Sequence, residues 1–444
     1  MCYVQNRRYA KDHEFSTGEL ATLTPEHIYR WMCTKVYGMP DPTPEDNPTH
    51  GRASSLMYYK KAISYFMPNK LMPWNAITRE GNPTRSIDVN DLIKAVKKKE
   101  VRKQGTPSNA DRPLEEQEFN QLITTLVSLE RPKERYMIPT ICKFQFHLNA
   151  RLDDTCHMKY DFIKPCPQFP FAVLCNVGWS KNVHEERDCP DQLMMGAMDP
   201  HYCILLTLAI YLEMWLGSGD ALLNPFMFGD YGVDPKTTKT WVRKVINDKV
   251  FDTDDFRRAQ VGKIGTHSVR KYSSTWMRRH GAHRDDADKR GRWTGKRKQV
   301  DVYIDLAIPY ADAKCASILC IGGPCKYVLK EGSNVSDEWL LEHVVPNIQS
   351  RLDGAIAKTL ARALLWAAFD NEVCLYVPTQ VRERIRFSYH SVPDGLEDEN
   401  PVKKYDLWCR DQSARSSILM KYRKTTRMAQ GRAPTIKTTL WRIN

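Results

Sequence analysis

Apolar positions recur at helical spacing in three segments of the N-terminal part of the chain, which predicts three helices. The segments lie near residues 25–37, 53–66 and 89–103. The last of them has Asp88 or Asn90 as a suitable N-cap. Its final turns are basic, a pattern that suits the helix macrodipole. The basic side chains are Lys97, Lys98, Lys99, Arg102 and Lys103.

A composition change follows these helices. Residues 104–113 (QGTPSNADRP) hold Gly, Ser, Asn and two prolines, which predicts a linker. Hydrophobic periodicity returns beyond it and predicts a second series of elements. We expect helices over Glu115–Leu129 and 137–151, short strands within 158–185 around the apolar run Phe171–Val177, a buried helix over 201–216, and helices with loops over 266–306.

The last part of the chain is less regular. It contains one apolar helix around Ile356–Phe369, and residues 410–444 form a strongly basic tail. The whole pattern predicts an α+β protein that is mainly helical with a small β-sheet. The expected divisions are an N-terminal helical domain at 1–103, the linker at 104–113, a second domain at 114–312, and a C-terminal extension at 313–444.

Charge and cysteine usage narrow the class of protein. The chain has 444 residues and a formal net charge of +13, which favours a polyanionic partner, nucleic acid before membrane. The apolar run Cys203–Trp215 is too short to span a bilayer and contains Glu213. The N-terminus lacks the apolar stretch of a signal peptide. The 13 cysteines are therefore expected to stay reduced inside the cell.

The chemistry-bearing residues gather in the second predicted domain. His267-x-x-Arg270 precedes Gly291-Arg292-Trp293, and Tyr303 follows ten residues after Trp293. Upstream are Arg151, in the sequence NARLDD, and Lys181, in a turn between expected strands. Two arginines can hold a phosphodiester by bidentate hydrogen bonds and stabilise the charge of a phosphorus transition state. A tyrosine phenol in that field can attack phosphorus and form an ester.

These residues resemble the Arg–Lys–His-x-x-Arg–His/Trp–Tyr signature of the tyrosine recombinases, over roughly residues 50–310. Asp154, three residues after Arg151, matches an acid that the family places there. The segment upstream of the catalytic block further resembles recombinases of eukaryotic Crypton-type mobile elements. The resemblance implies a core-DNA-binding domain at 1–103, a catalytic domain at 114–312, and a nuclear enzyme that works on duplex DNA as a tetramer, without cofactor or metal.

The resemblance also implies a role for each residue. Tyr303 would be the nucleophile, Arg151 and Arg270 would hold the phosphate, and His267 would assist proton transfer. Trp293 would donate its ring N–H to the phosphate, and Lys181 would protonate the leaving oxygen. Further DNA contacts are expected from Arg292, Lys296, Arg297 and Lys298, and from the basic turns ending at Lys103, which would equally serve as a nuclear localisation signal.

Several alternatives stay open. Lys159 or Lys164 could replace Lys181, and Tyr310 is a rival nucleophile. The chain could be a DNA-binding protein that kept the fold and lost the chemistry, or an enzyme resembling type IB topoisomerases. A zinc site at Cys315, Cys320, Cys325 and His343 is disfavoured because no CxxC pair is present.

Overall fold

A computed structural model of the chain describes residues 8–10, 13–14, 18, 22–180, 183, 188–257, 262–293, 310–393 and 399–407. Contacts divide the chain into two units, Met1–Ala110 and Asp111–Asn444, which are described separately. The described part is mainly helical with a five-stranded antiparallel sheet, so the predicted α+β class is confirmed. None of the described helices is long and apolar enough to cross a membrane.

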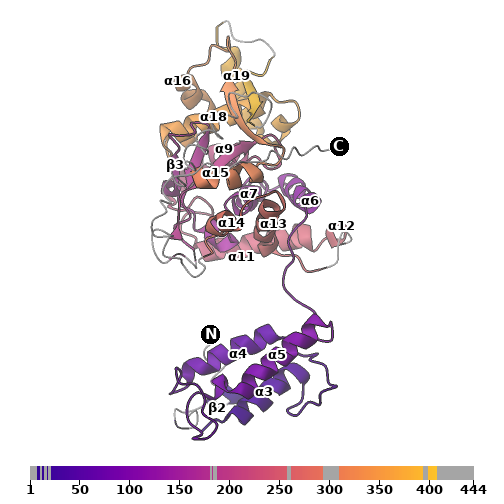
Figure 1. Cartoon of the computed structure of the whole chain (residues 1–444). Helices are drawn as coiled ribbons and strands as arrows, with labels where there is room; N and C mark the ends of the chain where they lie inside the picture. Colours follow the sequence, from indigo (N-terminus) through magenta and orange to yellow (C-terminus); the bar gives the residue numbers. More distant parts are fainter. Residues whose placement is uncertain are drawn as a thin grey trace, which may run out of the picture. The chain divides into compact units, whose positions relative to one another are not determined.

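The first unit is a small group of helices (Figure 1). Its elements are α3 (Pro25–Tyr37), α4 (Ala53–Phe66), the 3-10 turn η1 (Pro83–Arg85), α5 (Ile87–Val101), and the short pair β1 (Arg8–Ala10) and β2 (His13–Glu14). Thr24 caps α3 at its start, and Gly38 ends it with φ of 81°. The N-cap of α5 is Ser86, whose hydroxyl accepts from the N–H of Val89, so the expected caps Asp88 and Asn90 were wrong.

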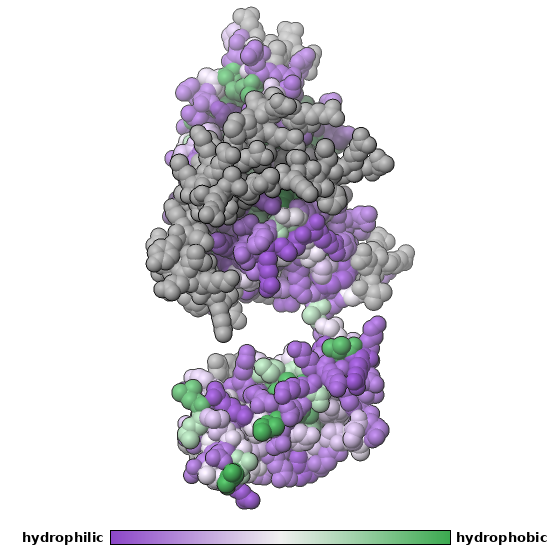
Figure 2. Space-filling view, in the orientation of Figure 1, coloured by the Kyte–Doolittle hydropathy of each residue, from purple (hydrophilic) through white to green (hydrophobic). Residues whose placement is uncertain are grey.

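The surface of the first unit carries several exposed apolar side chains. Leu71, Ile77, Ile87 and Val101 are among them, and Figure 2 shows hydrophobic side chains interspersed with hydrophilic ones on this unit. On the same view, the surface over α13 and α14 of the second unit is largely hydrophilic. Residues 104–113, which include the boundary after Ala110, form neither helix nor strand.

The second unit holds most of the helices. Their bounds are α6 (Glu116–Val127), the π-turn η2 (Lys133–Met137) leading into α7 (Ile138–His147), α8 (Leu152–Cys156), η3 (Tyr160–Phe162), α9 (Ile204–Trp215), α10 (Gly219–Leu223), α11 (Pro235–Ile246) with η5 (Asn247–Phe251), α12 (Asp254–Arg257), α13 (Thr266–Arg279), α14 (Arg284–Arg290) and α15 (Tyr310–Leu319). The helix expected over 137–151 therefore ends at His147. Arg151 does not lie inside a helix: it is the extended N-cap of α8.

The sheet joins segments from two distant parts of the sequence. Its strands are β3 (Ile163–Pro165), β4 (Ala172–Cys175), β5 (Gln192–Ala197), β6 (Pro324–Leu329) and β7 (Val402–Asp406), in that spatial order. Ile163 pairs with Cys175, Gly196 with Cys325, and Leu329 with Val402. Every neighbouring pair is antiparallel, so the C-terminal strands extend the sheet that β3–β5 begin.

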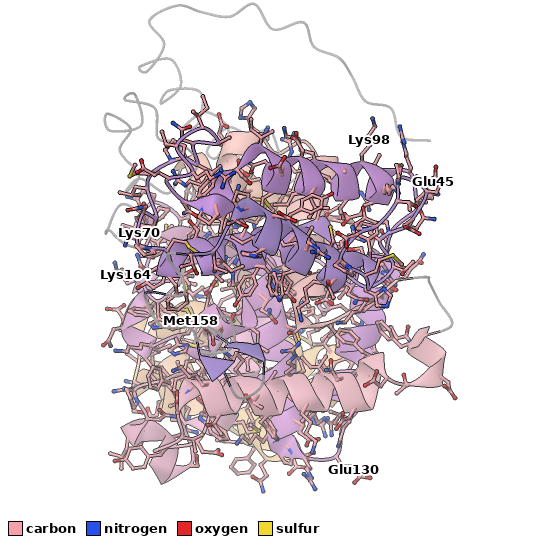
Figure 3. All side chains as sticks on the ribbon, turned by 90° about the horizontal axis from the view of Figure 1, so that it is seen from below. Glu45, Lys70, Lys98, Glu130, Met158 and Lys164 are labelled. Atoms are coloured by element: carbon pink, nitrogen blue, oxygen red, sulfur yellow. The ribbon has the colours of Figure 1, made fainter. Side chains whose placement is uncertain are left out.

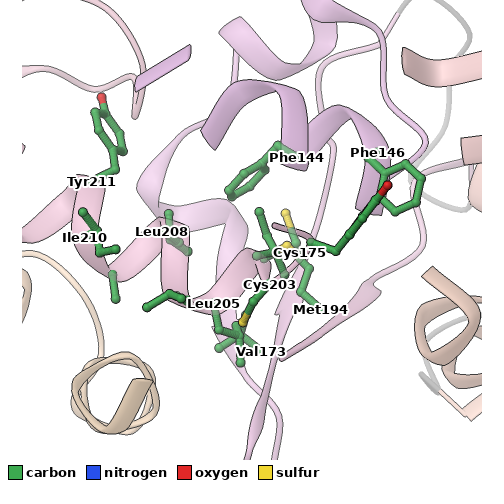
Figure 4. Close-up of a cluster of buried hydrophobic side chains, with 14 of the residues drawn as sticks. Phe144, Phe146, Val173, Cys175, Met194, Cys203, Leu205, Leu208, Ile210 and Tyr211 are labelled. Carbon is green, nitrogen blue, oxygen red and sulfur yellow. The ribbon is translucent and has the colours of Figure 1, made fainter. Parts of the chain in front are cut away.

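Helices of the C-terminal part pack on the same core. They are α16 (Asp337–Trp339), η7 (Leu340–Val344), α17 (Pro346–Gln349), α18 (Gly354–Phe369), η8 (Val373–Tyr376) and α19 (Thr379–His390). The buried helix α18 contacts both α9 and strands of the sheet. Figure 4 shows the interior beside α9, where Phe144, Val173, Met194 and Leu205 meet. This core fixes the end of α7, from which the candidate site begins.

Candidate active site

A tight turn carries the chain from α7 into the site. Asn149 is buried with φ of 46°, a left-handed conformation that asparagine tolerates better than most residues. Its side-chain oxygen accepts from the hydroxyl of Ser274 in α13, at 3.0 Å. The Ser273 hydroxyl donates to the carbonyl of Phe146 at 2.5 Å. These contacts join the end of α7 to α13, so that Arg151 and the His267-x-x-Arg270 motif meet.

Asp154 is the centre of the arrangement. Its carboxylate is buried, and Oδ2 accepts from the backbone N–H of Arg151 at 3.0 Å. Among the described residues, three guanidinium groups face the same oxygen: Arg151 at 3.9 Å, Arg270 at 3.6 Å and Arg292 at 3.6 Å. Three cations around one carboxylate leave an excess of positive charge, and the separations are too long for strong hydrogen bonds.

The guanidinium of Arg270 is buried and only partly hydrogen-bonded. Its side chain is 3% exposed, and Nη2 donates to the carbonyl of Gly291 at 2.5 Å. Its Nη1 is buried and has no hydrogen-bond partner among the described residues. Burial and the neighbouring guanidinium groups of Arg292 and Arg151 lower the pKa of Arg270 to about 9, against the opposing effect of Asp154. Binding an anion here would relieve both the repulsion and the unsatisfied donor.

Arg151 lies more openly. Its side chain is 26% exposed, and Nη1 lies 3.5 Å from the hydroxyl of Ser180, in the segment that follows β4. The arginine therefore offers N–H donors to solvent beside the buried pair of Arg270 and Asp154.

His267 and Trp293 flank the arginines. His267 is partly exposed in the first turn of α13, and partial burial together with Arg270 and Arg151 lowers its pKa. The neutral imidazole is then the dominant form at pH 7. The Trp293 ring is 38% exposed and lies over the guanidinium of Arg270, 5.1 Å from its central carbon. A Cβ at position 291 would lie 2.7 Å from the Trp293 ring, so only glycine leaves room for the ring in this position.

Arg292 occupies a different place from the surface DNA contact expected of it. Its backbone has φ of 54°, and its side chain is only 2% exposed. Nη1 donates to Gln192 at 2.8 Å and to the carbonyl of Leu148 at 3.2 Å, and Nη2 donates to the carbonyl of Asn149 at 3.3 Å. In this structure Arg292 supports the turn that positions Arg151, and it cannot reach a DNA phosphate without leaving these partners.

Other expected residues are placed as follows. Lys181, Lys296, Arg297, Lys298 and Tyr303 lie outside the described residues. The alternative Lys164 lies 3.4 Å from Asp191, and Lys159 lies over the ring of Phe226. Tyr310 is the first residue of α15. In the described ranges, no group of three or more His, Cys, Asp or Glu side chains is placed to hold a metal ion.

The basic turns of α5 belong to the first unit. Lys97, Lys98, Arg102 and Lys103 are exposed there, and Figure 3 labels Lys98 near the outside of the molecule. Lys99 is different, because its ammonium donates to the carbonyls of Pro44 and Asp46. Sequence reasoning treated these residues alike, since spacing along the helix does not reveal the loop that Lys99 holds.

Sequence reasoning also missed Ser180 as a neighbour of Arg151 and Trp179 as a ring stacked on His157. The only available signal was the polar sequence WSKN after an apolar strand. No protein-family model matches the chain. No similar sequence is found among curated proteins either.

Proposed function

We propose that the chain is a DNA strand transferase of the tyrosine recombinase class, a site-specific recombinase or transposase. The observation that carries the proposal is that Arg151 and Arg270 both face the buried Asp154, with His267 close enough to the two arginines for them to lower its pKa. An incompletely compensated pair of arginines beside a neutral imidazole suits a phosphodiester that gains charge during reaction. The order of these residues along the chain supports the same class.

The proposed reaction has two transesterification steps. The Tyr303 phenol oxygen attacks the scissile phosphorus, its proton passes to His267, and the bond from phosphorus to the 5′ oxygen breaks. Lys181 protonates that leaving oxygen, which leaves a 3′-phosphotyrosyl ester and a free 5′ hydroxyl. The 5′ hydroxyl of a partner strand then attacks the ester and releases Tyr303. Because the ester keeps the energy of the broken bond, rejoining requires no nucleotide cofactor.

The side chains have distinct parts in this scheme. Arg151 and the spare donor of Arg270 would bind the non-bridging oxygens, and Trp293 would donate its ring N–H. The guanidinium groups supply the charge stabilisation that metal ions give in other phosphoryl transfers. The proposal includes duplex DNA as partner, a tetramer on two DNA sites, and a nuclear location.

Covalent trapping tests the proposal. The full chain and Tyr303→Phe are incubated in EDTA with nicked duplexes whose positions around the nick are randomised. A cut beside a nick releases a short fragment, so the adduct cannot be resealed. We expect wild type to form a denaturation-resistant protein–DNA adduct and Tyr303→Phe to form none, a loss of at least about 10³-fold.

Each other outcome identifies a different protein. An adduct that persists in Tyr303→Phe but disappears in Tyr310→Phe moves the nucleophile to Tyr310. An adduct with relaxation of supercoiled DNA, but without strand exchange between duplexes, indicates a topoisomerase-like enzyme. DNA binding without any adduct from wild type overturns the proposed chemistry and leaves a DNA-binding protein.

A further inference from the structure

Trp179 is an exposed aromatic side chain that the proposed reaction does not use. It lies in the segment after β4, and its residue is 40% exposed. Its ring stacks on the imidazole of His157, with centroids 3.5 Å apart and planes 4° apart. Because the imidazole covers one face of the indole, the exposed area belongs to the opposite face and the edge.

The protein holds this ring in place from beneath. His157 is 9% exposed, and its Nδ1–H donates to the carbonyl of Asp153 at 2.8 Å. The ring of Phe226 also meets that of His157 edge-on, 6.1 Å away at 86°. An exposed tryptophan on a rigid support loses little conformational freedom when a ligand stacks on it.

Trp179 is adjacent to the arginine site. The next residue, Ser180, lies 3.5 Å from Nη1 of Arg151, and His157 directly follows α8, which Arg151 caps. Lys239 pairs with Asp153 in the same helix, so this ion pair adds no net charge beside the site. A ligand that stacks on Trp179 would be close to Arg151, whose guanidinium can bind a phosphate.

These features together describe a nucleotide subsite: a flat apolar face beside phosphate-binding donors. We propose that Trp179 is a stacking platform for a nucleobase that leaves the duplex stack next to the phosphate bound by Arg151. The inference rests on the proposed function, because it assumes that the arginine site binds DNA. Stacking of a base on an aromatic side chain changes affinity by about 5- to 150-fold, and the opposing cost of unstacking is least for a base that is already unpaired.

A cycle of protein and DNA changes tests the platform. The dissociation constant of the full chain is measured for nicked duplexes, with a single abasic nucleotide placed at each position around the nick in turn. On intact DNA, we expect Trp179→Ala to weaken binding about 10-fold or more, and Trp179→Phe to recover most of the loss. At the position of the stacked base, the abasic nucleotide should weaken binding by wild type as much as Trp179→Ala weakens binding to intact DNA. The same abasic nucleotide should not weaken binding by Trp179→Ala any further.

Phe387→Ala is the matched control, because Phe387 is a 78% exposed aromatic residue on α19 outside the site. Its binding should match wild type on every duplex. The platform is overturned if Trp179→Ala binds DNA as tightly as wild type does. It is also overturned if the effects of Trp179→Ala and of the abasic nucleotide on the dissociation constant multiply at every position. Trp179 would then be better explained as a contact for another protein.

The binding measurement separates this inference from the proposed chemistry. If wild type forms no covalent adduct but its binding and that of Trp179→Ala depend on the abasic position as expected, the platform is supported and the strand transfer is overturned. If wild type and Trp179→Ala form an adduct at the same rate and bind DNA with equal affinity, the strand transfer is supported and the platform is overturned.

Discussion

Asp154 illustrates how one buried carboxylate can organise a site for an anion. It accepts the backbone N–H that caps α8 and faces the guanidinium groups of Arg151, Arg270 and Arg292. One carboxylate facing three guanidinium groups compensates their charge incompletely. The remaining positive charge favours binding of an anion, and the proposed function takes that anion to be a phosphate.

Arg292 gives a prediction at the scale of a single side chain. Arg292→Met removes donors from the carbonyls of Leu148 and Asn149 and leaves them buried. We expect the free energy of unfolding to fall by about 3 kcal/mol, measured by urea denaturation of the full chain. The salt dependence of DNA binding should stay unchanged below the transition.

Arg284→Met is the control for this prediction. Arg284 is in the neighbouring helix α14, and its side chain is 79% exposed, so its loss should change stability by less than about 0.5 kcal/mol. If Arg292→Met is as stable as wild type and its DNA binding depends less on salt, the prediction is wrong and Arg292 is a direct DNA contact.

At the scale of elements, periodicity predicted helices better than it predicted their ends. The expected segments 25–37 and 53–66 coincide with α3 and α4, whose apolar positions face the core of the first unit. The expected helix 137–151 ends four residues early, because Asn149 turns the chain so that Arg151 can cap α8. That turn depends on contacts with α13, which local sequence does not encode.

The sheet shows the same limit. Short strands were expected only within 158–185, whereas β5, β6 and β7 complete the sheet through pairing between distant segments. Helix α19 was not predicted, although its buried residues Val381, Ile385 and Tyr389 recur at helical spacing. In the candidate site, residue order suggested that Arg151 and Arg270 would meet, but the buried role of Arg292 depends on Gln192 and the α7 turn.

The basic end of α5 gives a prediction that separates two kinds of lysine. Lys97 and Lys98 are exposed, so replacing both with alanine should weaken DNA binding and reduce its salt slope by about one per lysine. Lys99→Ala should instead lower the melting temperature, because its ammonium holds the carbonyls of Pro44 and Asp46. Fluorescence anisotropy at several salt concentrations and thermal melts of the full chain would measure the two effects. A lower melting temperature for the Lys97/Lys98 double variant, or an unchanged one for Lys99→Ala, would contradict this division.

At the scale of the whole molecule, the C-terminal part is built into the second unit. Strands β6 and β7 continue the sheet, and α18 packs on α9 beneath it. Glu213 of α9 is fully buried and binds this part directly. Its carboxylate accepts from Asn347 at 3.0 Å, from the backbone of Ile348 at 3.2 Å and from Arg384 at 2.7 Å. Removing the C-terminal part would expose both this carboxylate and the edge of β5.

Glu213→Ala tests this integration. The substitution leaves the Ile348 N–H unsatisfied and removes the partner of Arg384, so we expect the unfolding free energy to fall by about 2–4 kcal/mol. Burial raises the pKa of Glu213 against the opposing effect of Arg384. Glu213→Gln keeps an acceptor oxygen for the contact with Asn347 or with Ile348, so it should lose less than the alanine variant. Because the contacts join α9 to α17 and α19, the loss should appear as one cooperative transition of the second unit and should increase proteolysis near Asn347. A normal melting curve with cleavage confined to the C-terminal part would mean that this part folds as a separate domain, and the sheet would then have to remain stable without β6 and β7.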